Sequence, residues 1–144
     1  IEMIFQTCVD KNPEFYYGAG YTFFGVLNAG RTEMLGGNLE KGREYFEKAM
    51  SMYEGKFLLT KLLYATSYAV NSQQPELFVR LLNEVATSSF EDPPDMKLPN
   101  VVARRDARQL LEQVGDFFPG YQGPSGLEPD VEPFIEEDID LDLD

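Results

Sequence analysis

The sequence predicts an all-α protein: an α-solenoid of antiparallel helix-turn-helix pairs with an extended acidic arm at its C-terminus. Apolar residues recur at helical spacing through residues 1–114. No stretch of that region shows the alternation typical of a strand. The turns between the expected helices are short, which favours antiparallel neighbours. We therefore divide the chain into a helical domain, 1–114, and an arm, 115–144.

The N-terminal residues predict two helices. Residues 1–9 read as the last turns of a helix with one apolar stripe. Asn12 is then a suitable N-cap and Pro13 fits the first helical position. A second helix is expected from Pro13 to about residue 29, where Gly30 ends it.

The next two helices differ in their patterning. Asn38 caps an amphipathic third helix, expected over residues 39–53. After a turn at Gly55, the fourth helix, 57–70, is apolar over more than half its girth. Lys61 is its only charge, so this should be the most buried helix, with the Lys61 amine reaching solvent or an anionic group.

Proline marks the remaining boundaries. Pro75 opens a fifth helix to about residue 87, and the segment 92–95 breaks the chain. Pro99 opens a sixth helix to about residue 114. In the arm, repeated Gly and Pro exclude a helix until at least Phe134.

The pair of helices within 13–53 has the residue pattern of a tetratricopeptide (TPR) unit. Small residues on its first helix allow close approach of the second: Gly18, Gly20, Gly25 and Ala29. The second helix carries aromatic residues. The overall period is too irregular for a standard repeat array, so the expectation is a TPR-like array.

Composition excludes several functions. The chain has no His and one Cys, which excludes a His-dependent catalytic triad and an internal disulfide. Its net charge is −13, and nine acids without a base lie in residues 128–144. Nucleic-acid binding is therefore not expected, nor is a metal or cofactor. No apolar run reaches the roughly 20 residues of a membrane span. Because the chain begins mid-helix, we expect a missing N-terminal segment.

Several motifs together resemble the T-component family of TRAP transporters. They comprise Tyr16-Tyr17-Gly18-Ala19, the Leu35-Gly36-Gly37-Asn38-Leu39-Glu40-Lys41 block, Gly55-Lys56-Phe57-Leu58-Leu59-Thr60-Lys61 and Tyr64-Ala65. They follow the order and spacing of that family's C-terminal half, over about residues 1–114. One departure is Gly42, where family members typically carry Ala; we expect a mild helix penalty of about 1 kcal/mol. The arm has no counterpart in the family.

The resemblance implies a TPR-like, non-enzymatic periplasmic component, commonly a lipoprotein tethered to a membrane. By the same resemblance it would sit at the outer membrane, its anchor lying in the missing N-terminal segment. It would associate with a periplasmic solute- or lipid-binding protein and bind or channel an apolar ligand, such as a lipid, a sterol or another hydrophobic organic molecule.

Aromatic residues supply the candidate binding site. Helices 13–29 and 57–70 would wall a cavity whose rings shield the ligand from water. The predicted lining residues are Tyr17, Tyr21, Phe24, Tyr64 and Tyr68. The alternative is that these rings form ordinary core with their hydroxyls satisfied internally.

Charged segments leave further alternatives open. A basic cluster on the sixth helix is expected to pair with Asp106, Glu112 or the acidic arm. The arm could be a solvated tail, dock along a groove or a neighbouring copy and so form a homo-oligomer, or bind calcium. The calcium candidates are Asp138, Asp140, Asp142 and Asp144.

Two other functions compete with ligand transport. A TPR-like scaffold would bind a protein or peptide on an open concave face and contain no ligand cavity. An enzyme is the third class, but the carboxylate pair Asp92/Asp95 lies in a proline-rich loop without apolar walls.

Overall fold

The structure is a computed structural model that describes residues 1–91, 94–124 and 126. Within these residues it is all helical and contains no strand, as predicted. The helices are α1 (Glu2–Lys11), α2 (Ala19–Gly30), α3 (Leu39–Ser51), α4 (Leu58–Leu63), α5 (Pro75–Thr87), α6 (Lys97–Leu111) and α7 (Val114–Phe117). A π-helix, η3 (Tyr64–Ala69), continues α4, and short 3-10 turns η1 (Glu33–Leu35), η2 (Met52–Gly55) and η4 (Pro94–Met96) lie in the connections.

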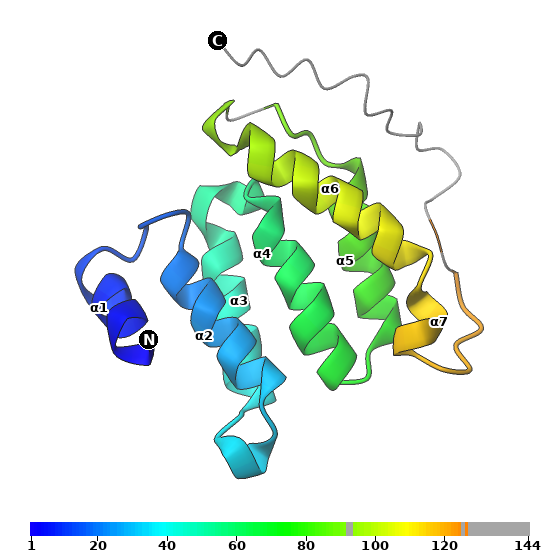
Figure 1. The fold of residues 1–144 in the computed structure, drawn as a ribbon, viewed down its shortest axis with the longest axis horizontal. Coiled ribbons are helices and arrows are strands. Elements are labelled where there is room, and N and C mark those ends of the chain that lie inside the picture. The colour runs from blue at the N-terminus through cyan, green and yellow to red at the C-terminus, as the bar shows by residue number, and fades with distance from the viewer. Residues whose placement is uncertain (92–93, 125, 127–144) are drawn as a thin grey trace.

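The helices form the predicted TPR-like array. α2 packs on α3, the α4–η3 segment packs on both of them and on α5, and α6 packs on α5 and α4. Contacts therefore run between first helices of successive pairs (α2, α4 and α6) as well as within each pair. Figure 1 shows α1, α2, α4 and α5 in chain order, with α3 behind α2 and α6 crossing over α4 and α5.

The core lies between the packed helices of this array. Phe46 of α3, Leu58 of α4, Phe78 and Leu82 of α5 and Leu111 of α6 are at most 1% exposed. Burying each such side chain stabilises the fold by about 1.5–3 kcal/mol. The apolar faces that place these residues follow the helical spacing seen in the sequence, so the core itself was predictable.

The predicted start of the second helix at Pro13 is wrong. The chain turns there, and α2 begins at Ala19 after three left-handed residues, Tyr16 (φ 44°), Tyr17 (φ 59°) and Gly18 (φ 78°). Tertiary contacts hold this turn. A Cβ on Gly18 would lie 2.9 Å from the Met52 sulfur, so the turn packs directly on the end of α3.

Two further helices differ from their predicted bounds. The third ends at Ser51, and Tyr53 and Glu54 continue into a left-handed turn (φ 52° and 56°). The fourth does not stay α-helical to residue 70, because its second half winds as the π-helix η3. Such π segments are rare and occur frequently at functional sites.

The C-terminal boundary also differs. The sixth helix starts at Lys97 rather than Pro99, and the prediction of no helix before Phe134 is wrong because α7 forms at 114–117. Phe118 after it is 5% exposed, with its ring 5.3 Å from that of Phe78. The acidic arm from 127 onward, with its predicted docking and calcium sites, lies outside the described residues.

Candidate apolar binding groove

The five aromatic residues predicted to line a cavity lie in three places. Tyr64 and Tyr68 of the π-helix are buried at 6% and 8% exposure. The Tyr64 ring stacks on Phe46 at 5.1 Å and lies 5.2 Å from the Tyr68 ring. These rings pack directly on one another and on the core.

Phe24 and Tyr21 lie on the side of α2 that faces α3. Phe24 is 9% exposed, and its ring is 5.4 Å from that of Tyr45. Tyr21 is half-buried, 6.3 Å from the same Tyr45 ring. It lines a shallow open depression of about 290 Å³ together with Lys41, Glu44, Tyr45 and Lys48.

Tyr17 lies at the third place, in the left-handed turn before α2. Its hydroxyl donates a hydrogen bond of 2.7 Å to the Asp95 carboxylate. Its ring packs against Phe57 at 4.7 Å and Tyr53 at 5.3 Å. Tyr17 therefore joins the turns before α2, α4 and α6.

A different set of residues forms an apolar groove between α1, α2 and the start of α4. The groove has a volume of about 330 Å³ and is open to solvent. Its lining is almost entirely apolar and consists of Phe5, Tyr16, Ala19, Thr22, Phe23, Val26, Phe57, Leu59 and Leu63. Four of these residues are aromatic. None of the five predicted residues is among them.

The two helices expected to wall a cavity both border this groove, while the five expected lining residues stay a separate prediction. The expected walls were the helices over 13–29 and 57–70, and the groove lies between these segments. The α2 wall is the stripe Ala19, Phe23 and Val26, at i, i+4 and i+7 spacing. That spacing could have identified the groove stripe from the sequence. However, α2 has aromatic residues on opposite faces, and the sequence alone does not say which face meets α3.

The groove contains few polar groups. Thr22 and Thr60 are buried, at 7% and 2% exposure, and their hydroxyls lie 3.3 Å apart in a hydrogen bond across α2 and α4. This contact satisfies Thr22 within the protein, which leaves the Tyr16 hydroxyl as the other polar side-chain group of the lining. No charged side chain lines the groove.

A second open depression lies on the other side of α4. It has a volume of about 400 Å³ and lies between α4, η3 and α6, lined by Leu62, Leu63, Thr66, Asp106, Gln109, Leu110 and Gln113. Leu63 borders both hollows. The face built by α2, α4 and α6 therefore has an apolar half and a half with amide and carboxylate groups.

Several charged side chains of the described residues form ion pairs outside the apolar groove. Lys61 of α4 is 23% exposed and forms a 3.3 Å ion pair with Glu84 of α5, which agrees with the expectation that its amine extends toward the surface. Arg105 pairs with Asp106 at 3.2 Å, one of the partners predicted for the basic cluster.

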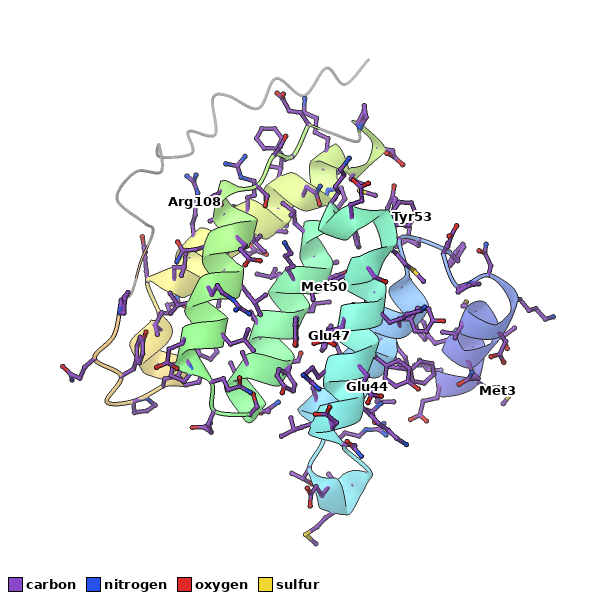
Figure 2. The ribbon with its side chains drawn as sticks, turned by 180° about the vertical axis from the view of Figure 1, so that it is seen from behind. Met3, Glu44, Glu47, Met50, Tyr53 and Arg108 are labelled. Atoms are coloured by element: carbon purple, nitrogen blue, oxygen red, sulfur yellow. The ribbon has the colours of Figure 1, made fainter. Side chains whose placement is uncertain are left out.

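The rear of α3 is acidic and carries its own cation. Figure 2 shows Glu44, Glu47 and Met50 along this helix. Arg43 pairs with Glu40 and lies 3.8 Å from the Glu47 carboxylate. The hydrogen bond to Glu40 raises the pKa of Arg43. The charges of Arg43, Glu40 and Glu47 on this face therefore pair with one another.

Two tyrosines make the stability of the fold depend on pH in the alkaline range. The hydrogen bond to Asp95 raises the pKa of Tyr17 to about 12, and burial raises that of Tyr64 to about 12. Because folding favours the protonated phenols, their contribution to stability is present below pH 10.0, the pKa of the unfolded tyrosines, and is lost as pH approaches 12.

Tyr17→Phe should flatten the loss of stability between pH 10 and pH 12, measured by urea unfolding at several pH values. An unchanged slope would contradict the assignment to Tyr17.

The described residues contain no group of three or more acidic, Cys or His side chains able to hold a metal ion. In the same part of the chain, none of the helices combines the length and the apolar character that crossing a bilayer requires.

The stacked antiparallel pairs and the open groove between their first helices define a TPR-like helical-array protein. A family model described as TRAP transporter T-component matches residues 1–118. The chain belongs to this family. No curated protein sequence matches it.

Family membership gives the coarse function. The chain is a transport-associated component of a family that is in general non-catalytic, and it associates with other TRAP transporter components. The family indicates a periplasmic, transporter-associated location. The match also includes α7 and Phe118, which pack on α5 as part of the array.

Proposed function

We propose that this T-component binds an apolar molecule in the groove between α1, α2 and α4, and exchanges it with a periplasmic solute- or lipid-binding protein. The observation that carries the proposal is the lining: four rings and no charged side chain around about 330 Å³. That volume is at the lower end of the range typical of small-molecule sites, about 300–1,000 Å³.

The chemistry of the lining favours a neutral ligand. Apolar burial contributes about 25 cal/mol per Å² removed from water, less the cost of ordering the ligand. A carboxylate placed among these side chains would lose its hydration without a cation to replace it. Lipids, sterols and other hydrophobic organic molecules fit this requirement. The open side favours exchange with a partner over long retention.

The aromatic set predicted from sequence remains a separate prediction. Tyr17, Tyr21, Phe24, Tyr64 and Tyr68 would line a ligand site only if the α2–α3–η3 packing opened, since the rings of Tyr64 and Tyr68 pack against each other and Tyr64 also stacks on Phe46. The groove residues need no such rearrangement, and this supports the groove as the site.

A direct test compares two aromatic truncations on the same helix. Phe23 lines the groove, whereas Tyr21 is half-buried on the other side of α2. We expect Phe23→Ala to weaken binding of the neutral probe N-phenyl-1-naphthylamine about tenfold, since a buried ring contributes about 1.5–3 kcal/mol. Tyr21→Ala should leave the affinity unchanged.

The readout is fluorescence titration of the purified protein, accompanied by solvent extraction and mass spectrometry of any co-purified lipid. Loss of affinity in Tyr21→Ala but not in Phe23→Ala would instead support the aromatic set predicted from sequence. Absence of saturable binding in the parent protein would remove the ligand proposal.

A protein-binding scaffold is the second candidate function. The apolar groove and the neighbouring depression share Leu63, and together they form an open face over α2, α4 and α6. Exposed Leu98 and Val102 of α6, at 59% and 38% exposure, add apolar surface. If the partner protein protects this face and no small molecule binds, the scaffold is the better description.

Two finer proposals remain, the first from the family resemblance and the second from the sequence of the acidic arm. One is an N-terminal lipid anchor and outer-membrane association, checked by membrane fractionation of the full-length protein. The other is self-association through the arm, 115–144, checked by comparing the mass in solution with and without it.

A further inference from the structure

We propose that the depression between α4, η3 and α6 is a docking site for an extended peptide segment of a partner protein, a segment that carries both apolar and basic side chains. The site is separate from the apolar groove, and it does not depend on the binding of a small molecule there. It combines a floor of leucines with two side-chain amides and one carboxylate.

The apolar part of the depression comes from both of its walls. α6 crosses α4 and packs on it, as Figure 1 shows. The hollow that these helices border with η3 has a volume of about 400 Å³ and is open to solvent. Leu62 in its lining is buried, and Leu63 and Leu110 are half-buried. An apolar side chain of a bound segment can therefore pack on leucines without entering a closed cavity.

The polar groups of the depression form a stripe along α6 and its end. Asp106, Gln109 and Gln113 line the hollow at i, i+3 and i+7, a spacing that places them on one face. At a rise of 1.5 Å per residue the stripe extends over about 10 Å, the length of about three residues of an extended chain. Groups arranged along such a line suit an extended segment better than a compact ligand.

The two amides of this stripe are available to a ligand. Gln109 and Gln113 are exposed, and neither side chain forms a hydrogen bond within the part of the chain that the structure describes. Each carboxamide offers both a donor and an acceptor. The C=O and N–H groups of an extended backbone need one of each, so the two amides can hold a segment through its main chain.

Asp106 determines the charge that the segment should carry. The two hydrogen bonds from Arg105 both go to its Oδ1, at 3.3 and 3.2 Å, which leaves Oδ2 without a partner among residues 1–91, 94–124 and 126. Of the described residues that line the depression, Asp106 alone is charged. It therefore favours a lysine or arginine. The acidic arm of this chain or of a second copy has the wrong charge, with nine acids and no base in residues 128–144.

A peptide segment also agrees with the family. The chain associates with other TRAP transporter components, and arrays of stacked helix pairs present extended surfaces that bind other chains. The net charge of −13 favours a basic segment in such a partner.

Two fluorescein-labelled hexapeptides test the charge preference. One has the sequence of residues 139–144, Ile-Asp-Leu-Asp-Leu-Asp, and the other carries lysine in place of each aspartate. We expect the basic peptide to bind the purified full chain roughly fivefold more tightly, measured by fluorescence anisotropy at physiological ionic strength. Tighter binding of the acidic peptide, or no saturable binding of the basic one, would overturn the proposal.

Three variants of the full chain localise the binding. Gln109→Ala removes one amide and should weaken binding of the basic peptide roughly threefold. Asp106→Asn should weaken it roughly two- to fivefold. Glu112→Gln is the matched control, because it makes the same change of charge at an exposed residue at the end of α6 that does not line the depression. Its affinity should equal that of the parent protein.

These variants also exclude binding through net charge alone. A peptide that binds the acidic arm or the whole acidic surface would respond equally to Asp106→Asn and Glu112→Gln and would not respond to Gln109→Ala. Either of these results would overturn the docking site.

A neutral probe separates this inference from the proposed function. Gln109 and Asp106 are not among the residues that line the apolar groove, so their variants should keep the parent affinity for N-phenyl-1-naphthylamine. Peptide binding without probe binding would support the docking site and reject the ligand groove. Probe binding without peptide binding would support the groove and reject the docking site.

Discussion

Gly42→Ala is expected to destabilise the protein, although alanine is the better helix former by about 1 kcal/mol. Gly42 is a buried residue of α3 at its crossing with α2. A Cβ there would lie 2.9 Å from the Ala29 Cβ and backbone nitrogen and 3.2 Å from its Cα. Backbone cannot rotate away as a side chain can, so α3 must move off α2. Overpacking of this kind costs about 1–3 kcal/mol, and the change in helix propensity offsets only part of it.

Thermal unfolding followed by circular dichroism measures this effect. A net loss of about 1 kcal/mol, the overpacking cost less the propensity gain, corresponds to a fall in Tm of roughly 3–6 °C for a domain of this size. Gly30→Ala is the control: it lies at the end of α2, and a Cβ added there would have no neighbouring atom within 4 Å. Equal or greater stability of Gly42→Ala would show that the α2–α3 contact is looser than the structure indicates.

Gly42 also bears on the groove. Because α2 supplies one groove wall and α3 fixes its opposite side, displacing α3 should disturb the position of Phe23 as well. The sequence suggested only a mild helix penalty at this position. The structure shows instead that glycine permits the closest approach of the two helices, which is a tertiary reason that helix propensity cannot express.

Asn100→Ala is the second substitution with a large expected effect. Asn100 of α6 is fully buried, at 0% exposure. Its side-chain oxygen accepts a 2.9 Å hydrogen bond from the Leu58 backbone N–H, and its amide donates one of 2.8 Å to the Lys56 carbonyl. A residue 42 positions away thus caps the start of α4. Removing the amide leaves the buried Leu58 N–H unsatisfied, at about 1–3 kcal/mol, and also removes the partly buried hydrogen bond to the Lys56 carbonyl.

We expect Asn100→Ala to lose about 3 kcal/mol of unfolding free energy in urea. Asn100→Asp keeps an acceptor for Leu58 but buries a carboxylate against the Lys56 carbonyl, so it should not restore the stability of the parent. Asn28→Ala serves as the control, because the Asn28 amide bonds to the Phe24 carbonyl within its own helix. A loss in Asn100→Ala no larger than in Asn28→Ala would argue against the capping role.

Local signals in the sequence identified most of the helices. Asn38 caps α3 as predicted, with its side chain accepting from the Lys41 N–H at 3.0 Å. Pro75 stands at the first position of α5. Gly36, with φ 84°, ends the turn η1 in the left-handed conformation that glycine favours. These features depend on neighbours in the chain, and a single sequence contains them in full.

The failures occurred where distant segments decide the local conformation. Asn12 and Pro13 suit a helix start, yet the chain stays in a turn through Gly18 because Tyr17 is held by Asp95 and Phe57. The lining of the groove likewise depends on packing between helices, because it is set by which side of α2 faces α3. The five aromatic residues predicted from the sequence stay a prediction.

The sequence by itself determined the helical class, the succession of helices and the residues of the core, because helical periodicity and end signals act over a few neighbouring positions. Only the tertiary structure decided the left-handed turns, the capping of α4 by Asn100 and the face of α2 that lines the groove. The turn at Tyr17 and the capping of α4 depend on contacts between residues 78 and 42 positions apart, and the face of α2 depends on its packing on α3. The free energy of such contacts outweighs the weak local preferences.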